Sequence, residues 1–304
     1  MISIKGERYI SFRNSTLPDL YPHKIKEDKL DYNNIRFLVE NHTIGGDTPA
    51  IQTYEFNVDS DKLFKALAGE IEVFFLKQHL QKVNLANSNN VDKTWLFVTN
   101  YYYAFYSATL LLRMKRTGFI FLSRSEANNL QNILTAVTGS LVQMPEGGYL
   151  FTSEEVSSNQ SKVILKKDNG NTHSKTWIMF HDFLKEYLAL SDAQNDEYTA
   201  LKKIDHIFSI YQQTFLSTRR NALNYQGIQA AKSIKSDLFG NTKYCNEEFG
   251  QLFKDLMSLQ ITSNKKYVDE AAYFLAPIFA ELSRNLYLDY REISGSKIFK
   301  GKYK

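Results

Sequence analysis

Apolar side chains recur at steps of three and four residues in several stretches of this 304-residue chain, which is the pattern of amphipathic helices. Five stripes of this kind predict packed helices, and they cover residues 63–74, 95–112, 177–187, 201–215 and 268–286. The fourth stripe continues in phase toward Arg219 and Arg220, so one long helix is predicted over this region. Ser123 or Ser125 is expected to cap a shorter helix, and Pro277 is expected to kink or split the last one.

Two stretches have strand patterns instead. In residues 52–58 the apolar positions alternate with polar ones, and residues 140–172 have the turn residues and apolar runs of a β-hairpin. We therefore expect a mainly α chain, a helical bundle with a β-hairpin insertion and a partly extended N-terminal region. Its parts would be an N-terminal extension at 1–60, a helical domain at 61–293 that carries the hairpin, and a basic tail at 294–304.

Composition narrows the chemistry. The net charge of +4 permits contact with nucleic acid without arguing for it, and the single cysteine, Cys245, excludes an internal disulfide and a cysteine-rich zinc site. No His pair has metal-ligand spacing and no Gly-rich phosphate loop occurs in the sequence, so neither a metal nor a cofactor is expected. The sequence has neither a long apolar run nor the pattern of a signal peptide. We therefore expect a soluble cytoplasmic protein that does not enter a membrane.

Two segments far apart in the sequence carry a resemblance. The aromatic run at 101–106, with Tyr102-Tyr103-Ala104-Phe105 at its centre, and the later segment Arg219-Arg220-Asn221-Ala222-Leu223-Asn224-Tyr225 resemble the two signature helices of the HEPN clan. Arg220, Asn224 and Tyr225 look like the Arg-x-x-x-Asp-Tyr arrangement of small HEPN proteins, with Asn in place of Asp. Over residues 60–290, the resemblance implies a four- or five-helix bundle of bacterial toxins, RNA-cleaving defence proteins and their non-catalytic relatives.

One expected residue is missing from the segment. Catalytic HEPN members place a His shortly after the Arg, whereas no His follows Arg219 or Arg220 anywhere in this chain. Asn224 cannot titrate, and a tyrosine such as Tyr225 needs strong activation before it exchanges a proton at neutral pH. Arg220 retains the ability to bind a phosphate through two parallel hydrogen bonds. His181 and His206, on neighbouring predicted helices, are candidates to replace the missing His, although a structural role is the alternative for both.

The candidate catalytic residues are therefore Arg220, Asn224 and Tyr225. Helical phase places Arg219 beside the apolar stripe, as a buried structural Arg, and gathers Arg220, Asn224, Ser217 and Gln213 on a polar face. The alternative for that face is an ordinary surface that contacts solvent or another subunit. The candidate binding residues are Arg219, Ser217, Gln213 and Asn221, together with Lys162 and Lys166 from a basic strip on the hairpin.

Three functions remain open from the sequence. The first is a non-catalytic or weakly catalytic HEPN-like subunit that binds RNA or a partner protein in a bacterial antiviral defence or toxin–antitoxin system. The second is an active, metal-independent ribonuclease in which Arg220 binds the phosphate and Tyr225 or a distant His transfers the proton. The third is an assembly subunit, in which the aromatic helix at 101–106 forms the seam of a homodimer or larger oligomer.

Overall fold

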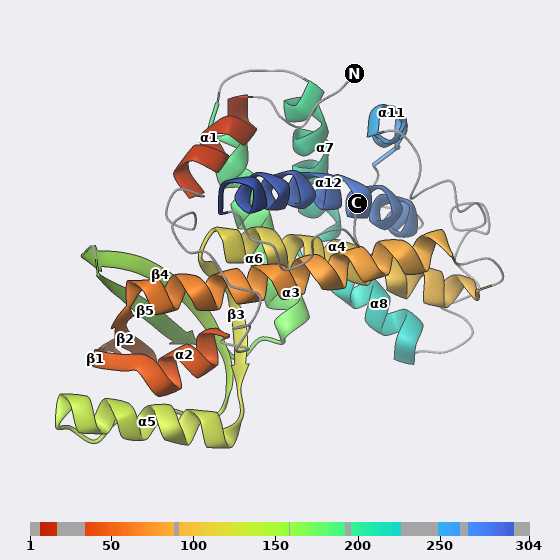
Figure 1. The fold of residues 1–304 in the computed structure, drawn as a ribbon. Helices are drawn as coiled ribbons and strands as arrows, with labels where there is room; N and C mark the ends of the chain where they lie inside the picture. The colour runs from red at the N-terminus through yellow and green to blue at the C-terminus, as the bar shows by residue number, and fades with distance from the viewer. Residues whose placement is uncertain are drawn as a thin grey trace. The chain divides into compact units, whose positions relative to one another are not determined.

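The computed structural model describes residues 7–16, 34–87, 91–157, 159–191, 196–225, 249–261 and 267–294. Most of these residues are helical and the others include a five-stranded antiparallel sheet (Figure 1), so the expectation of a mainly α chain is confirmed. Cys245 and residues 295–304, which are nearly all of the basic tail, lie outside these ranges. Within them, no helix combines the length and the apolar character needed to cross a membrane.

The helices are α1 (Glu7–Thr16), α2 (Ile35–His42), α3 (Ser60–Ala86), α4 (Lys93–Met114), α5 (Arg124–Thr138), α6 (Thr172–Leu188), α7 (Asp196–Tyr211), α8 (Phe215–Tyr225), α11 (Phe249–Ser258) and α12 (Val268–Ser294). The strands are β1 (Thr43–Ala50), β2 (Thr53–Asp59), β3 (Thr117–Leu122), β4 (Gly147–Ser157) and β5 (Gln160–Lys167). The chain forms two compact units. A helical unit takes in Met1–Ser15, Phe74–Leu110 and Thr176–Tyr287, and a sheet unit takes in Thr16–Val73, Leu111–Lys175 and Leu288–Lys304.

In the sheet unit, the strand order is β1-β2-β5-β4-β3. The predicted hairpin is confirmed as β4 and β5, and the predicted strand at 52–58 is confirmed as β2, which pairs with β5 in the register Tyr54↔Leu165. The hairpin and the strand that precedes α3 therefore belong to one sheet. Helices α2 and α5 lie next to one another beside this sheet (Figure 1). Leu134 of α5 packs closely on Gly46 of β1: a Cβ atom on Gly46 would lie only 2.6 Å from Leu134 Cδ2, so a larger residue would not fit at this position.

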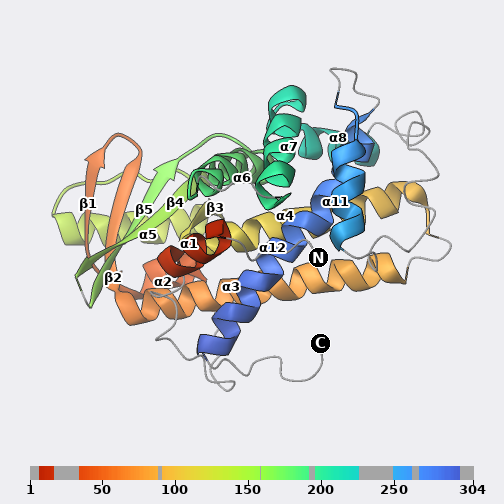
Figure 2. The same ribbon diagram turned by 90° about the horizontal axis from the view of Figure 1, so that it is seen from above.

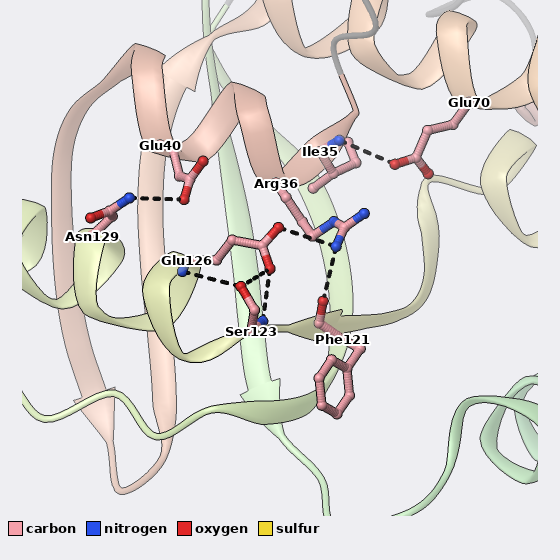
Figure 3. Close-up of polar contacts among 8 residues, drawn as sticks. All are labelled: Ile35, Arg36, Glu40, Glu70, Phe121, Ser123, Glu126 and Asn129. Carbon is pink, nitrogen blue, oxygen red and sulfur yellow. Dashed lines mark hydrogen bonds and ion pairs between the residues drawn. The ribbon is translucent and has the colours of Figure 1, made fainter.

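β3 is the last strand of the sheet that the described residues form, and two arginines cover its outer edge. Arg113 donates to the carbonyls of Thr117, at 3.0 Å, and Phe119, at 3.3 Å. Arg36 donates to the carbonyl of Phe121 at 3.2 Å and pairs with Glu126 of α5 (Figure 3). Because an uncovered strand edge is a template for unwanted pairing, these guanidinium groups protect the end of the sheet.

The core of the helical unit is aromatic. Helices α6 and α7 lie side by side (Figures 1 and 2), and Trp177 and Phe180 of α6 pack against Phe208 of α7 and Phe279 of α12. The apolar stripes predicted at 177–187 and 268–286 are buried at the positions that define them. The first position of the stripe predicted at 95–112 is wrong, because Trp95 is 63% exposed and the buried face of α4 begins at Leu96 to Val98.

One expected helix cap is present, and the helices depart from the sequence expectation at two other points. Ser123 caps α5 through a capping box with Glu126 (Figure 3), as one of the two expected caps. Pro277 does not split the last helix, since α12 runs unbroken from Val268 to Ser294. The single long helix expected to carry both arginines is also wrong: α7 ends at Tyr211, α8 begins at Phe215, and Gln212 between them has a left-handed φ of 73°.

Candidate functional site

The structure brings the two resembling segments into contact inside the helical unit. Arg220 of α8 donates through Nη2 to the hydroxyl of Tyr102 on α4 and through Nη1 to Oδ1 of Asn221, at 2.6 Å. Its guanidinium carbon lies 5.3 Å from the ring centroid of Tyr102 and 5.6 Å from that of Tyr101. These distances are within the range of cation–π attraction, so two aromatic faces and two hydrogen bonds orient this guanidinium.

The break after α7 decides which arginine is buried. The helical phase predicted from residues 201–215 placed Arg219 on the buried side, but α8 starts a new phase at Phe215. As a result Arg220 is the buried arginine of the pair, whereas Arg219 is half-buried. Arg219 donates from Nε to Oδ1 of Asp269 at 2.6 Å and from Nη2 to Oδ2 at 2.7 Å. This pair connects α8 to the first turn of α12. Arg219 therefore has the structural role expected of it, without the expected burial.

The other residues of the predicted polar face do not converge on Arg220. Ser217 is buried and donates to the carbonyl of Thr214 at 2.9 Å, one turn back in the chain. Asn224 and Tyr225 lie in the last turn of α8, both exposed, and the Tyr225 ring is 78% exposed. Among the candidate residues on α8, Asn221 accepts a hydrogen bond from the guanidinium of Arg220.

Gln213 binds a histidine instead. His181 of α6 lies with Nε2 2.9 Å from Asp205 Oδ1 and with Nδ1 3.0 Å from Gln213 Nε2. An amide nitrogen only donates, so Nδ1 accepts from Gln213 and Nε2 carries the hydrogen that is donated to Asp205. Both ring nitrogens of His181 are thus engaged, and the ring stacks on Phe208 at 5.2 Å. His206 is exposed on α7.

Two phenols near Arg220, those of Tyr101 and Tyr106, are held in their neutral form. Burial raises the pKa of Tyr101 well above its ordinary value, although the hydrogen bond from Trp177 Nε1, 3.2 Å away, and the charge of Arg220 oppose this shift. Burial also raises the pKa of Tyr106, with Tyr102 adding to the shift and Arg220 opposing it. These two hydroxyls therefore stay protonated at neutral pH and do not act as bases there.

The aromatic run of α4 is only partly accessible. Tyr101 and Tyr103 are buried, while Tyr102 and Tyr106 are half-buried. The aromatic run at 101–106 is consequently not a continuous exposed seam. Its accessible half, Tyr102 and Tyr106, is the part that adjoins Arg220.

The two lysines predicted on the hairpin belong to the sheet unit, and one of them is neutralised. Lys162 of β5 lies 2.8 Å from Glu55 of β2 and 3.7 Å from Glu154 of β4, so it forms the centre of a ladder of charges across three strands. The hydrogen bond with Glu55 is the main reason that the pKa of Lys162 is raised. Lys166 is exposed on the same strand. A uniformly basic strip is thus absent from the described part of the hairpin.

No group of three or more His, Cys, Asp or Glu side chains in the described ranges is arranged to hold a metal ion. Sequence reasoning also missed Phe74 and Lys77 of α3, which lie beside Tyr106. No local signal connects them to the Arg segment, because they come together only through the packing of α3 on α4. No family model, no curated protein and no solved structure matches this chain.

Proposed function

We propose that this chain is a HEPN-like subunit of a bacterial defence or toxin–antitoxin system that binds RNA and has little or no ribonuclease activity of its own. The observation that carries the proposal is the contact between Arg220 and Tyr102, which joins the two segments of the resemblance. A guanidinium recognises phosphate through paired hydrogen bonds, and it does so best when its orientation is fixed beforehand. Tyr102 and Asn221 supply that orientation here.

Weak or absent catalysis follows from the groups around the guanidinium. Cleavage through the RNA 2′-OH needs a group that exchanges a proton near neutral pH, and histidine is the usual one. The described hydrogen bonds of Arg220 go to a phenol and an amide, and the two ring nitrogens of His181 are bound to Asp205 and Gln213. The site thus offers a preoriented phosphate binder whose described hydrogen-bond partners are a phenol and an amide, and neither of these is the histidine that such cleavage usually uses.

Fluorescence anisotropy with a labelled single-stranded RNA tests the binding. Arg220→Ala should weaken the affinity by about 10- to 100-fold, since a hydrogen bond to a charged group contributes about 1.5–3 kcal/mol. Arg220→Lys keeps the positive charge but cannot form the two parallel hydrogen bonds of a guanidinium, so its affinity for RNA should lie between those of the wild type and Arg220→Ala. Lys202→Ala is the matched control, because it removes one positive charge from an exposed position of the same unit.

Gel analysis of the same RNA after long incubation tests for cleavage. Intact RNA bound by the wild-type protein, with affinity lost in Arg220→Ala, is the expected result. Cleavage that disappears in Arg220→Ala would establish the ribonuclease alternative instead. Absence of RNA binding by the wild-type protein, or equal losses in Arg220→Ala and Lys202→Ala, would refute the proposal.

A further inference from the structure

We propose that Tyr102, Tyr106 and Phe74 form a track on which the bases of single-stranded RNA stack, with Lys77 contacting the backbone beside it. This inference rests on the proposed function and specifies how the RNA would be held near Arg220. The four residues, here called the stacking track, all belong to the helical unit. They come from α3 and α4.

The rings of the stacking track follow one another with related orientations. Tyr102 and Tyr106 are one turn apart on α4, with ring centroids 5.6 Å apart and planes inclined by only 28°. Phe74 of α3 lies next to Tyr106, with centroids 6.4 Å apart and planes inclined by 36°. All three residues are half-buried, so none of them is wholly enclosed by the helical unit.

Cations lie at both ends of this row of rings. Lys77 is exposed, and its ammonium nitrogen lies 5.3 Å from the centroid of Phe74 and 5.7 Å from that of Tyr106. At the other end, the guanidinium carbon of Arg220 lies 5.3 Å from the centroid of Tyr102. Proteins that bind single strands combine aromatic faces for the bases with cations for the phosphates, and this row has both.

The same chemistry predicts which nucleic acids the track accepts. Every base has an aromatic face, so the track should tolerate many sequences but require unpaired bases. In a duplex the bases are stacked on one another and unavailable to these rings. An abasic strand presents phosphates to Lys77 and Arg220 without anything to stack on the rings.

The test measures the affinity of an RNA of about 12 nucleotides by anisotropy, within the range of site sizes known for single-strand binders. Tyr106→Leu keeps an apolar side chain but removes the ring, and it should weaken binding at least about fivefold. Tyr106→Phe keeps the ring and should bind within about twofold of the wild type. Trp95→Leu is the matched control, because it removes an exposed ring elsewhere on α4.

A second set of variants separates the track from charge alone. Lys77→Gln should weaken binding more than Lys82→Gln, which makes the same change on α3 roughly 140° away around the helix. Because Lys77 is exposed, this variant should fold normally even if Tyr106→Leu unfolds. Replacing the RNA with an abasic strand should abolish the difference between wild type and Tyr106→Leu.

The outcomes distinguish the two proposals. If the wild-type protein binds no RNA, the proposed function and the stacking track both fail. If binding requires Arg220 but is unchanged in Tyr106→Leu and Lys77→Gln, the proposed function stands and the track is refuted. Equal affinity for duplex or abasic strands would also refute the track.

Discussion

The buried pair of Glu70 and Arg113 should contribute strongly to the stability of the sheet unit. Glu70 of α3 binds Nε of Arg113, and the side chains are 12% and 4% exposed. Through its other oxygen, Glu70 accepts from the backbone N–H of Ile35 at 3.1 Å (Figure 3). Arg113 donates in turn to two edge carbonyls of β3. One carboxylate therefore fixes the start of α2, the end of α4 and the edge of the sheet.

The magnitude follows from what each substitution leaves behind. Glu70→Gln preserves volume and an acceptor for Ile35 but leaves Arg113 buried beside a neutral group. Removal of one partner from a buried ion pair costs about 3–5 kcal/mol in the free energy of unfolding. Glu70→Ala also leaves the backbone N–H of Ile35 without its acceptor, which adds about 1–3 kcal/mol to the loss in the free energy of unfolding. Because whole domains are stable by only about 5–15 kcal/mol, either variant should be visibly weakened.

Urea unfolding followed by circular dichroism, together with hydrogen exchange at the amides of β3 and β4, measures the effect. Exchange is needed because both tryptophans, Trp95 and Trp177, belong to the helical unit and do not report on the sheet. Arg36→Ala is the matched control: Arg36 also covers an edge carbonyl of β3, but its side chain is 40% exposed. An exposed pair of this kind contributes about 0–1 kcal/mol.

The double variant Glu70→Gln with Arg113→Met completes a thermodynamic cycle. Loss of both charges should cost less than the sum of the two single losses, by at least about 1 kcal/mol, because no unpaired charge remains. Additive losses would mean that the two side chains do not interact. A loss in Glu70→Gln no larger than that in Arg36→Ala would refute the reasoning from burial.

Three further predictions concern single positions. Ser123→Ala removes the side-chain cap of α5 and should cost about 1 kcal/mol in thermal unfolding, whereas Ser123→Asp should retain most of the stability. Gly139→Ala should cost about 1–2 kcal/mol, because Gly139 ends α5 with a φ of 68°, and Gly139→Asn should cost less by the same assay. Burial, followed by the charges of Lys82 and Arg284, lowers the pKa of His79 below its ordinary value of 6.5. The unfolded chain therefore takes up this proton first, and stability present above about pH 6.5 is lost as the pH falls below it. Urea unfolding of His79→Gln should show a smaller loss between about pH 7 and 5, and an unchanged slope would contradict this assignment.

Local patterns in the sequence determined much of the secondary structure. The spacing of apolar residues located α4, α6 and α12, alternation located β2, and Ser123, one of two expected caps, located the start of α5. Each of these signals spans only a few residues, so a single stretch of chain contains all of the information. The resemblance likewise identified Arg220 from its own neighbourhood in the sequence.

The failures lie where the backbone turns without a strong local signal. The break between α7 and α8 occurs at Gln212, a residue type that rarely adopts a positive φ, and nothing in the apolar periodicity marks it. Periodicity continued through the break therefore predicted the wrong buried arginine. Pro277 does not split α12, because the packing of this helix in the core of the helical unit overrides the usual preference to end a helix at proline.

Only the tertiary structure decided which distant residues meet. Arg220 and Tyr102 are 118 residues apart, and Phe74 and Lys77 reach Tyr106 from another helix. The pairing of β2 with β5 and the coverage of the β3 edge by Arg36 and Arg113 are equally non-local. The sequence by itself determined the elements, because helix and strand preferences act between near neighbours. The site required the fold, because contacts between elements depend on how whole apolar faces are buried together.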